Sequence, residues 1–442
     1  MASELNQAIS HPMDSCAYKA MSGVKVSRVS IQPENRTEIS VGLGGGGDLY
    51  FSFPSRPDSF LNSMNSYISF TYTFEGTTGG VADTRMWWAN GNPASCIAVL
   101  NTTANATELE NIADYNVLAN LVDDFSGADR SRTLGTILQD KSPINIKEGF
   151  NRNPNAGQEG LTQERRVCIP LLSLAVGTCA DKYLPMGKDI GLRLRLGLAD
   201  PLLATASNVL DANLPGFSPA YKLKDITYEA EYLTVPSNIY QSLLHEADGV
   251  FKVSGTGIGS FSVSGSGGQG QQTLLIPARY SSVRNFFTTN RVSTILTNKR
   301  INSVGSRCRD NIASYAYRIC GVNYPNLPIA CDAFTSAEAL TEVIKCWSGP
   351  AELGMNVAFN STNFVENFGT GATQGCFVMG IQFEESNFSA LQMSGVNTTS
   401  GSTFLEVSYA SGQTSTPTVF NTFAFYDTIM EITQNGEVIV SK

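Results

Sequence analysis

The residues best suited to acid–base chemistry in this 442-residue chain are two pairs of adjacent carboxylates, Asp123–Asp124 and Glu384–Glu385. General acid–base work needs two carboxylates that face one cavity. Glu384 and Glu385 fall in an expected strand, where neighbours point to opposite faces. Asp123 and Asp124 fall in an expected helix, where neighbours lie about 100° apart. Neither pair therefore predicts a catalytic dyad.

The chain has two histidines, His11 and His245. His245 follows two leucines near the end of an expected helix, where an imidazole can interact with the last free carbonyl groups. No G-x-S-x-G motif supplies a serine nucleophile for it, and His11 lies in an N-terminal segment without clear periodicity. We therefore expect no histidine-dependent hydrolase and no catalytic residue.

Metal binding would depend largely on the nine cysteines, at positions 16, 96, 168, 179, 308, 320, 331, 346 and 376. Their number is odd, their spacing is wide and no C-x-x-C pair occurs, whereas zinc sites use closely spaced ligand pairs. The pattern predicts buried free thiols in a reducing compartment, without a metal site.

Two glycine-rich stretches match the dinucleotide fingerprint G-x-G-x-x-G, through Gly42, Gly44 and Gly47 and through Gly265, Gly267 and Gly270. The fingerprint binds pyrophosphate where it follows a strand and opens a helix, because the helix N-terminus holds the phosphates. Both stretches lead into apolar strands instead. They predict flexible turns and no cofactor-binding residue.

Trp87 and Trp88, together with the tyrosines, could stack on sugars as in a lectin. Paired aromatic side chains in a long loop can equally be buried where subunits meet, and we favour the subunit contact. Sequons that would mark glycans on a secreted protein occur at Asn35, Asn101, Asn105, Asn360, Asn387 and Asn397. In a chain this rich in Asn, Ser and Thr, chance explains them better.

The composition favours a β-rich protein that associates with other proteins. Glycine is abundant, at 40 residues, and charged residues make up only 16% of the chain, below the usual ~25%. The net charge is −9 and no basic run occurs at either end, so we expect no direct sequence-specific nucleic-acid binding. The N-terminus lacks a secretory signal, and the longest apolar stretch, 167–180, is too short to span a membrane.

Alternating hydrophobicity predicts strands along most of the chain from residue 24. In 66–74, Ile68, Phe70, Tyr72 and Phe74 share one face, and in 190–198 every second residue is Ile or Leu; this period of two marks half-buried strands. Apolar residues at three- and four-residue spacing predict helices over 106–125, 238–246 and 335–347. Thr335 and Glu338 are placed as a capping box for the last of these.

The order of elements repeats between the two halves of the chain. Each half opens with a strand, passes a glycine-rich turn, continues with an apolar strand closed by Pro54 or Pro277, carries an amphipathic helix in a long insertion and closes with a long alternating strand. The repeat predicts an all-β protein of two tandem eight-stranded antiparallel jelly rolls with helical insertions. We expect an N-terminal arm over 1–23, a first jelly roll over 24–236 and a second over 237–442.

Several segments in this order resemble the double jelly-roll major capsid proteins of non-enveloped DNA viruses, of the polinton-like virus and virophage type. In the first half they are LYFSFPSRPDSFLNSMNSYISFTYTF, CIPLLSL, YLPMG, IGLRLRLGL and LKDITYEAEYLTVP; in the second they are SYAYRICGVNYPNLPI, SAEALTEVIKCW and FAFYDTIMEITQNGEVIV. The order of the segments carries the resemblance, which extends over 24–442.

The resemblance implies a structural protein without enzymatic activity or cofactor. It would form pseudo-hexameric homotrimers that tile an icosahedral virion shell, which is compatible with two similar sandwiches repeated around a threefold axis. The implied partners are neighbouring capsid trimers, penton and minor capsid proteins and an internal membrane, and the implied location is the virion, assembled inside the host cell. The alternative is a β-sandwich carbohydrate-binding or adhesion protein, favoured by the aromatic residues and the sequons.

Overall fold

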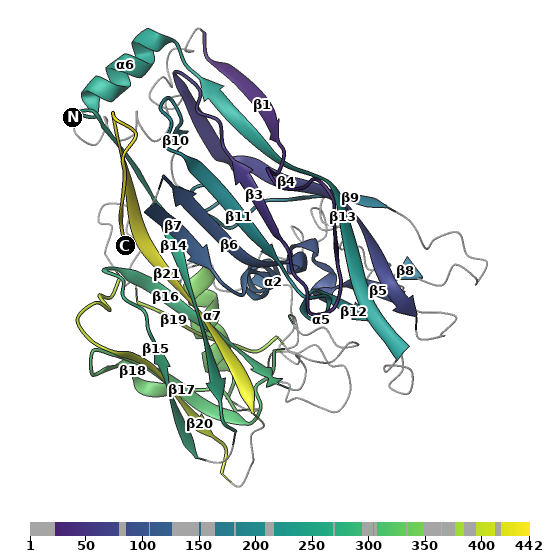
Figure 1. The fold of residues 1–442 in the computed structure, drawn as a ribbon. Coiled ribbons are helices and arrows are strands. Elements are labelled where there is room, and N and C mark those ends of the chain that lie inside the picture. Colours follow the sequence, from purple (N-terminus) through teal and green to yellow (C-terminus); the bar gives the residue numbers. More distant parts are fainter. Residues whose placement is uncertain are drawn as a thin grey trace.

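The structure is a computed structural model of the chain. It describes residues 23–78, 85–105, 107–125, 150–151, 164–180, 183–207, 216–267, 270–293, 304, 307–332, 335–348, 364, 376–383, 395–411 and 417–442. The expected N-terminal arm, apart from Gly23, lies outside these residues, as do Glu384 and Glu385. Figure 1 shows the described part of the chain and labels most of its helices and strands.

The first half of the chain forms two main antiparallel sheets. The larger contains β1 (Lys25–Ile31), β13 (Phe217–Thr234), β4 (Ser59–Thr78) and β10 (Leu184–Pro185) in that order, with β2 (Ile39–Val41) on β13 and β9 (Arg165–Ile169) on β4. The smaller contains β3 (Asp48–Ser52), β11 (Leu192–Leu198), β6 (Ile97–Ala104) and β7 (Thr107–Ile112). A separate sheet joins β12 (Thr205–Ser207), β5 (Arg85–Trp88) and β8 (Phe150–Asn151).

The second half forms another pair of antiparallel sheets. One contains β14 (Val250–Gly265), β21 (Thr418–Thr433), β16 (Val283–Val292) and β19 (Val378–Gln382), with β22 (Val438–Ser441) on β21. The other contains β15 (Gln271–Ile276), β20 (Thr403–Tyr409), β17 (Ile312–Ile319) and β18 (Val322–Ala330).

The two halves have the same strand topology. When the eight main strands of each half are numbered in chain order, with β9 and β10 counted together, both halves have sheets ordered 1-8-3-6 and 2-7-4-5. Two four-stranded sheets connected in this order are a jelly roll. The fold class expected from the sequence, two tandem eight-stranded antiparallel jelly rolls, is therefore confirmed.

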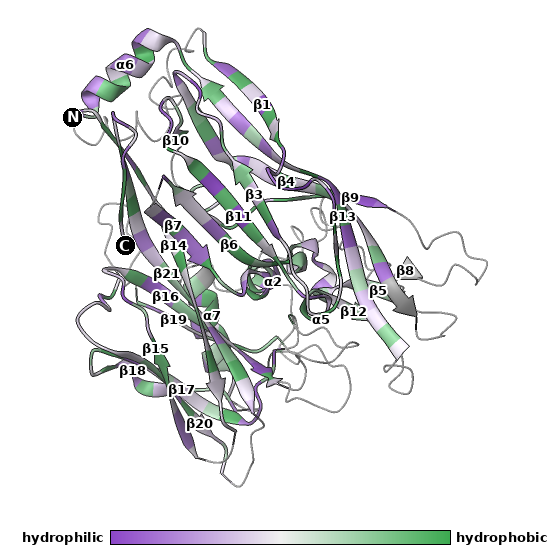
Figure 2. Cartoon of the chain, in the orientation of Figure 1, coloured by the Kyte–Doolittle hydropathy of each residue, from purple (hydrophilic) through white to green (hydrophobic). Residues whose placement is uncertain are grey.

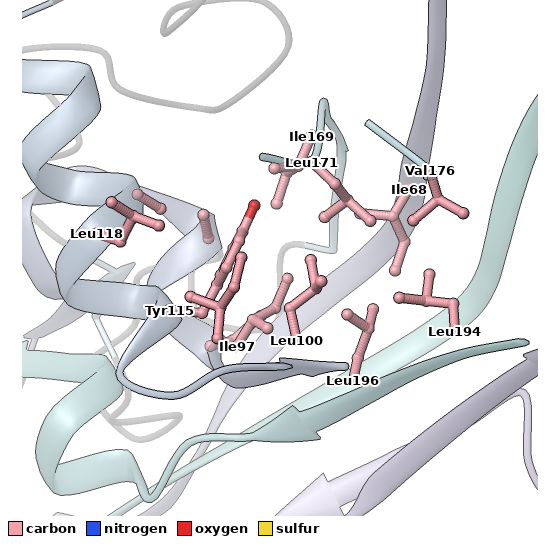
Figure 3. Packing of buried hydrophobic residues seen from close by; sticks show 14 of the residues in the cluster. Ile68, Ile97, Leu100, Tyr115, Leu118, Ile169, Leu171, Val176, Leu194 and Leu196 are labelled. Carbon is pink, nitrogen blue, oxygen red and sulfur yellow. The ribbon is translucent and has the colours of Figure 1, made fainter. Parts of the chain in front are cut away.

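Alternating hydrophobicity explains how each roll encloses a core. In β11, Leu192, Leu194 and Leu196 are buried while Arg193 and Arg195 are exposed. The same alternation appears as changing colour along the strands in Figure 2. Figure 3 shows the inward side chains of the first roll in contact with Tyr115 and Leu118 of a helix. Because each strand buries one face, the buried faces of the two sheets in a roll must pack against each other.

Four helices are described: α2 (Tyr115–Phe125), α5 (Pro201–Ala204), α6 (Ser237–Glu246) and α7 (Ala337–Ser348), with single 3-10 turns at Ala89–Gly91 and Pro93–Cys96. The helices expected over 238–246 and 335–347 are confirmed. The capping box is not, because the Thr335 amide bonds to Asp332 and the Glu338 carboxylate accepts from the Ala330 amide.

The helix expected over 106–125 is wrong in its first half. Residues Thr107–Ile112 form β7, and the helix begins only at Tyr115. Leu109 and Ile112 are buried in this strand. Their three-residue spacing also fits the apolar stripe of a helix, which is why the sequence predicted one. The long insertion expected to carry this helix is also interrupted, since β6 and β7, which precede the helix, are integral strands of the first roll.

The glycine- and serine-rich residues that precede the expected turn at Gly265–Gly270 form a strand. β14 pairs with β21 without interruption from Val250 to Gly265. Its glycines admit close neighbours: a Cβ on Gly257 would lie 2.4 Å from the Tyr426 ring, and one on Gly259 would lie 2.1 Å from the Tyr280 hydroxyl. Glycine is used here for close packing, which composition alone does not distinguish from a loop.

The long strands of both rolls run in roughly the same direction in Figure 1, from upper left to lower right. α6 lies at one end of this stack, beside the start of β14 and the end of β13. None of the described helices is long and apolar enough to cross a membrane.

Candidate interaction site between the two jelly rolls

The two rolls meet along α2 and the outer face of the β14–β21–β16 sheet, a contact that we call the inter-roll junction. It contains Phe125 of α2, whose ring centroid lies 6.2 Å from that of Phe287 in β16. Phe287 and Phe423 belong to the same buried cluster as the first-roll core. The apolar core is therefore continuous between the rolls.

Charged residues are paired across this junction. Arg307 of the second roll forms an ion pair with Asp124 at the end of α2, and its side chain is only 1% exposed. Asn90 donates a second hydrogen bond to Asp124, at 3.2 Å. Burial alone would lower the pKa of Arg307, but the Asp124 carboxylate and Cys376 raise it on balance. A buried ion pair of this kind fixes the relative orientation of the two segments that it joins. Removing one of its members is costly, because the other charge is then buried without a partner.

A second polar contact lies at the other end of α2. The Asn421 amide of β21 donates to the Asp114 carboxylate at 2.7 Å, and its oxygen accepts from Arg291 at 2.7 and 3.1 Å. Burial lowers the pKa of Arg291. The carboxylates at the two ends of α2 are thus linked to arginines of the other roll, Asp124 to Arg307 directly and Asp114 to Arg291 through Asn421.

The backbone also crosses the junction. Gly255 of β14 pairs with Ala180, and the Thr256 amide donates to the Cys179 carbonyl at 3.0 Å. A Cβ on Gly255 would lie 2.5 Å from Leu174 and 2.6 Å from the Cys179 carbonyl oxygen. Only glycine allows this approach without displacing backbone.

Glu110 of β7 holds the segment that makes this backbone contact. Its carboxylate accepts from the Ser173 hydroxyl at 2.6 Å, from the Leu174 amide and from the Thr102 hydroxyl. Burial raises the pKa of Glu110 to about 6, in opposition to these donors. The junction therefore contains one carboxyl group that titrates near neutrality.

The residues singled out for chemistry are not brought together. Asp124 serves the junction, and His245 lies exposed in the last turn of α6. The Gly42–Gly47 stretch leads into β3 and not into a helix. Within the described ranges, no group of three His, Cys, Asp or Glu residues could hold a metal ion.

The described cysteines are free thiols, at positions 96, 168, 179, 308, 320, 331, 346 and 376. Burial raises the pKa of Cys308 and of Cys331 to about 12. Thiols held in the protonated form in this way are chemically inert. Cys16 lies outside the described residues.

The expected contact between subunits is wrong for Trp88, whereas the half-buried Trp87 leaves it a prediction. The Trp88 side chain is 2% exposed and packs against Tyr72, Phe74 and Tyr221 of the same roll, with ring centroids 5.0, 5.0 and 5.1 Å away. Trp88 is therefore available neither to a neighbouring subunit nor to a sugar. The expectation fails for Trp88 because a tryptophan in the short strand β5 can fill the core of its own roll.

Three sequons have their asparagine nitrogen engaged within the chain. Nδ2 of Asn35 donates to the Asp48 carbonyl at 2.5 Å, that of Asn101 to Glu108 at 3.0 Å, and that of Asn105 to the Gly436 carbonyl at 3.1 Å. The Asn105 bond links the two rolls. A glycan on these nitrogens would displace the contacts.

The sequence analysis missed Asp114, Arg291, Arg307 and Asn421. The signal that was available is an arginine inside an apolar strand, as at Arg291 in VRNFFTTNRV. The partner could not be read from the sequence, because Arg307 and Asp124 are 183 positions apart and Asn421 and Asp114 are 307 apart.

No family model matches the sequence. No curated protein matches it either. Among solved structures, VP54 of the virus PBCV-1, fitted into a reconstruction of the virophage Sputnik, superposes with a TM-score of 0.60 at 10% identity, over 96% of this chain and 98% of that one. The Faustovirus major capsid protein gives 0.55 at 6% identity, over 93% and 91%.

The chain has the fold of these capsid proteins. The PBCV-1 virus capsid structure superposes with a similar TM-score, 0.58 at 11% identity, over 96% of this chain and 98% of that one. Coverage above 90% in both directions means that the likeness includes both rolls and their relative placement. The double jelly-roll resemblance drawn from the order of sequence segments is therefore confirmed at the level of the fold.

Proposed function

We propose that this chain is a major capsid protein that forms pseudo-hexameric homotrimers and tiles an icosahedral virion shell. The observation that carries the proposal is the pair of rolls with identical topology, fixed side by side in one chain. Three such chains around a threefold axis give six similar sandwiches and so approximate a hexagon, while every contact remains part of a closed symmetric assembly.

The inter-roll junction supports this proposal because a tile requires a fixed angle between its rolls. The continuous core, the Arg307–Asp124 pair and the Gly255–Ala180 bridge resist hinge motion between them. We divide the chain into an arm over 1–23, a first roll over 24–236 and a second over 237–442. The proposed role is structural and not catalytic.

The proposed partners are neighbouring capsid trimers, penton and minor capsid proteins and an internal membrane, and the proposed location is the virion, assembled inside the host cell. The net charge of −9 gives no support to direct contact with the genome. The carbohydrate-binding alternative has less support, since Trp88 is buried and three sequon nitrogens are engaged.

Light scattering of the purified protein tests the proposal. We expect a mass near 142 kDa, three times 47.5 kDa, and hexagonal blocks in negative stain. Gly255→Val, which forces the rolls apart, should remove the hexagonal outline, whereas Gly42→Ala, at a site with open space around it, should retain it. A 47.5 kDa monomer that binds a glycan array would contradict the capsid role and favour the lectin.

A further inference from the structure

A cavity of about 230 Å³ lies where α6 meets the start of β14 and the end of β21. Its apolar wall consists of Tyr240 and Leu244 of α6, Phe251 of β14 and Ile432 of β21, all buried. The rings of Tyr240 and Phe251 lie 5.8 Å apart. We call this space the seam cavity, because the linker and both rolls contribute to it.

The rim of the seam cavity is polar. Asp58 and Lys188 place one acidic and one basic side chain on it, and Gln241 and Gln434 lie exposed beside them. Pockets for small-molecule ligands usually measure about 300–1,000 Å³. The seam cavity is smaller, and its apolar wall with a mixed-charge rim fits a few side chains of a peptide segment better than a cofactor.

The described part of the chain begins beside the apolar cluster that supplies the wall of this cavity. Val24 packs against the cluster that contains Tyr240, Leu244 and Phe251, and Gly23 abuts Pro236, which lies 3.2 Å from the position of a Cβ on that glycine. The 22 residues before it include the run MDSCAYKAMS over 13–22. At 3.3–3.6 Å per residue, Tyr18 can lie up to about 17 Å from Gly23, which brings it within reach of the cavity.

We propose that residues 13–22 of the same chain dock in the seam cavity, with Tyr18 and Met21 against the apolar wall. Methionine adapts to irregular apolar gaps, and Lys19 and Asp14 complement the opposite charges of Asp58 and Lys188. A tether of a few residues gives an effective concentration in the millimolar range, which favours the chain's own segment over that of a second copy. The proposal does not depend on a capsid function.

Disulfide trapping tests the proposal with the native Cys16. In a Cys320→Ser background, which removes the exposed thiol, we introduce Gln241→Cys on the rim. The matched control is Ser242→Cys, the next exposed residue of α6, which does not line the cavity. Mild oxidation followed by peptide mapping should give a link within one chain, about tenfold faster at position 241 than at 242. Equal rates, or links only between chains, would overturn the proposal.

Trypsin cleavage after Lys19 gives an independent measure that needs no new thiol. Gln241→Trp should fill the cavity, displace the segment and accelerate this cleavage by about tenfold, because cleavage follows the population of the undocked state. Ser242→Trp adds the same side chain outside the cavity and should leave the rate unchanged. Equal cleavage in the wild type and both variants would show that the segment is not docked there.

Discussion

Breaking the Arg307–Asp124 pair should destabilise the protein through the inter-roll junction. Asp124→Ala removes the counter-charge of a guanidinium that is 1% exposed. Among the described residues, the Nε and Nη1 atoms of this guanidinium have no hydrogen-bond partner. Removing one member of a buried pair costs about 3–5 kcal/mol. Asp124 is itself 16% exposed, so we expect a value near the lower limit, about 3 kcal/mol.

The reverse substitution should cost less. Arg307→Met leaves Asp124 with its solvent contact and its hydrogen bond from Asn90, and we expect a loss of about 1–2 kcal/mol. The double variant removes both charges and should lie within about 1 kcal/mol of the wild type, because apolar replacement of a buried pair is often neutral. The two single effects should therefore not add, with a coupling energy of about 3 kcal/mol.

Urea unfolding gives the free energies for this cycle, and hydrogen exchange in α2 and β16 shows whether the rolls separate first. Lys252→Ala is the control, since its ion pair joins the exposed Lys252 to the half-buried Glu431 and should contribute less than about 1 kcal/mol. Additive effects, or an Asp124→Ala variant as stable as this control, would refute the view that the pair fixes the junction.

Three further predictions concern single residues. Gly255→Ala should destabilise the protein by more than about 2 kcal/mol, because its Cβ would overlap Leu174 and backbone, whereas Gly42→Ala should stay within about 0.5 kcal/mol; thermal unfolding separates the two. The folded-state pKa of Glu110, about 6, lies above its ordinary value of 4.5, so its protonated form adds stability below pH 4.5 that is lost as the pH rises through 6. The difference is about 2 kcal/mol, and urea midpoints at pH 4.5 and 7 should show it in the wild type and not in Glu110→Gln. Trp88→Ala should lower the free energy of unfolding by about 3–5 kcal/mol and leave the oligomeric mass unchanged. A lower mass by light scattering would show that Trp88 does support a contact between subunits.

Much of the fold could be predicted because strand alternation is a local signal. β11 and β13 alternate over long runs, and α6 and α7 carry clear helical spacing. Where the local signal was ambiguous, prediction failed: Leu109 and Ile112 fit a helical stripe, but the pairing of β7 with β6 makes them strand residues. The tertiary hydrogen bonds of a sheet override local spacing in such cases.

The junction could not be predicted because its contacts join positions far apart in the chain. Asp114 looks like a helix-start residue and Asn421 like one polar residue in a strand, and only the fold brings them within 2.7 Å. The close approach at Gly255 could not be predicted either, since glycine for close packing and glycine for turns look alike in composition.

The covalent tandem of two rolls with one topology has a consequence for stoichiometry. Separate sandwiches would combine in proportions set by their concentrations, whereas the linker at Ser237–Glu246 fixes one copy of each roll in every subunit. The two rolls share their strand order but differ in sequence, so their outer edges can carry different side chains. A ring of three chains would then alternate two kinds of edge, and each junction with a neighbouring ring would have a defined polarity that six identical sandwiches could not encode.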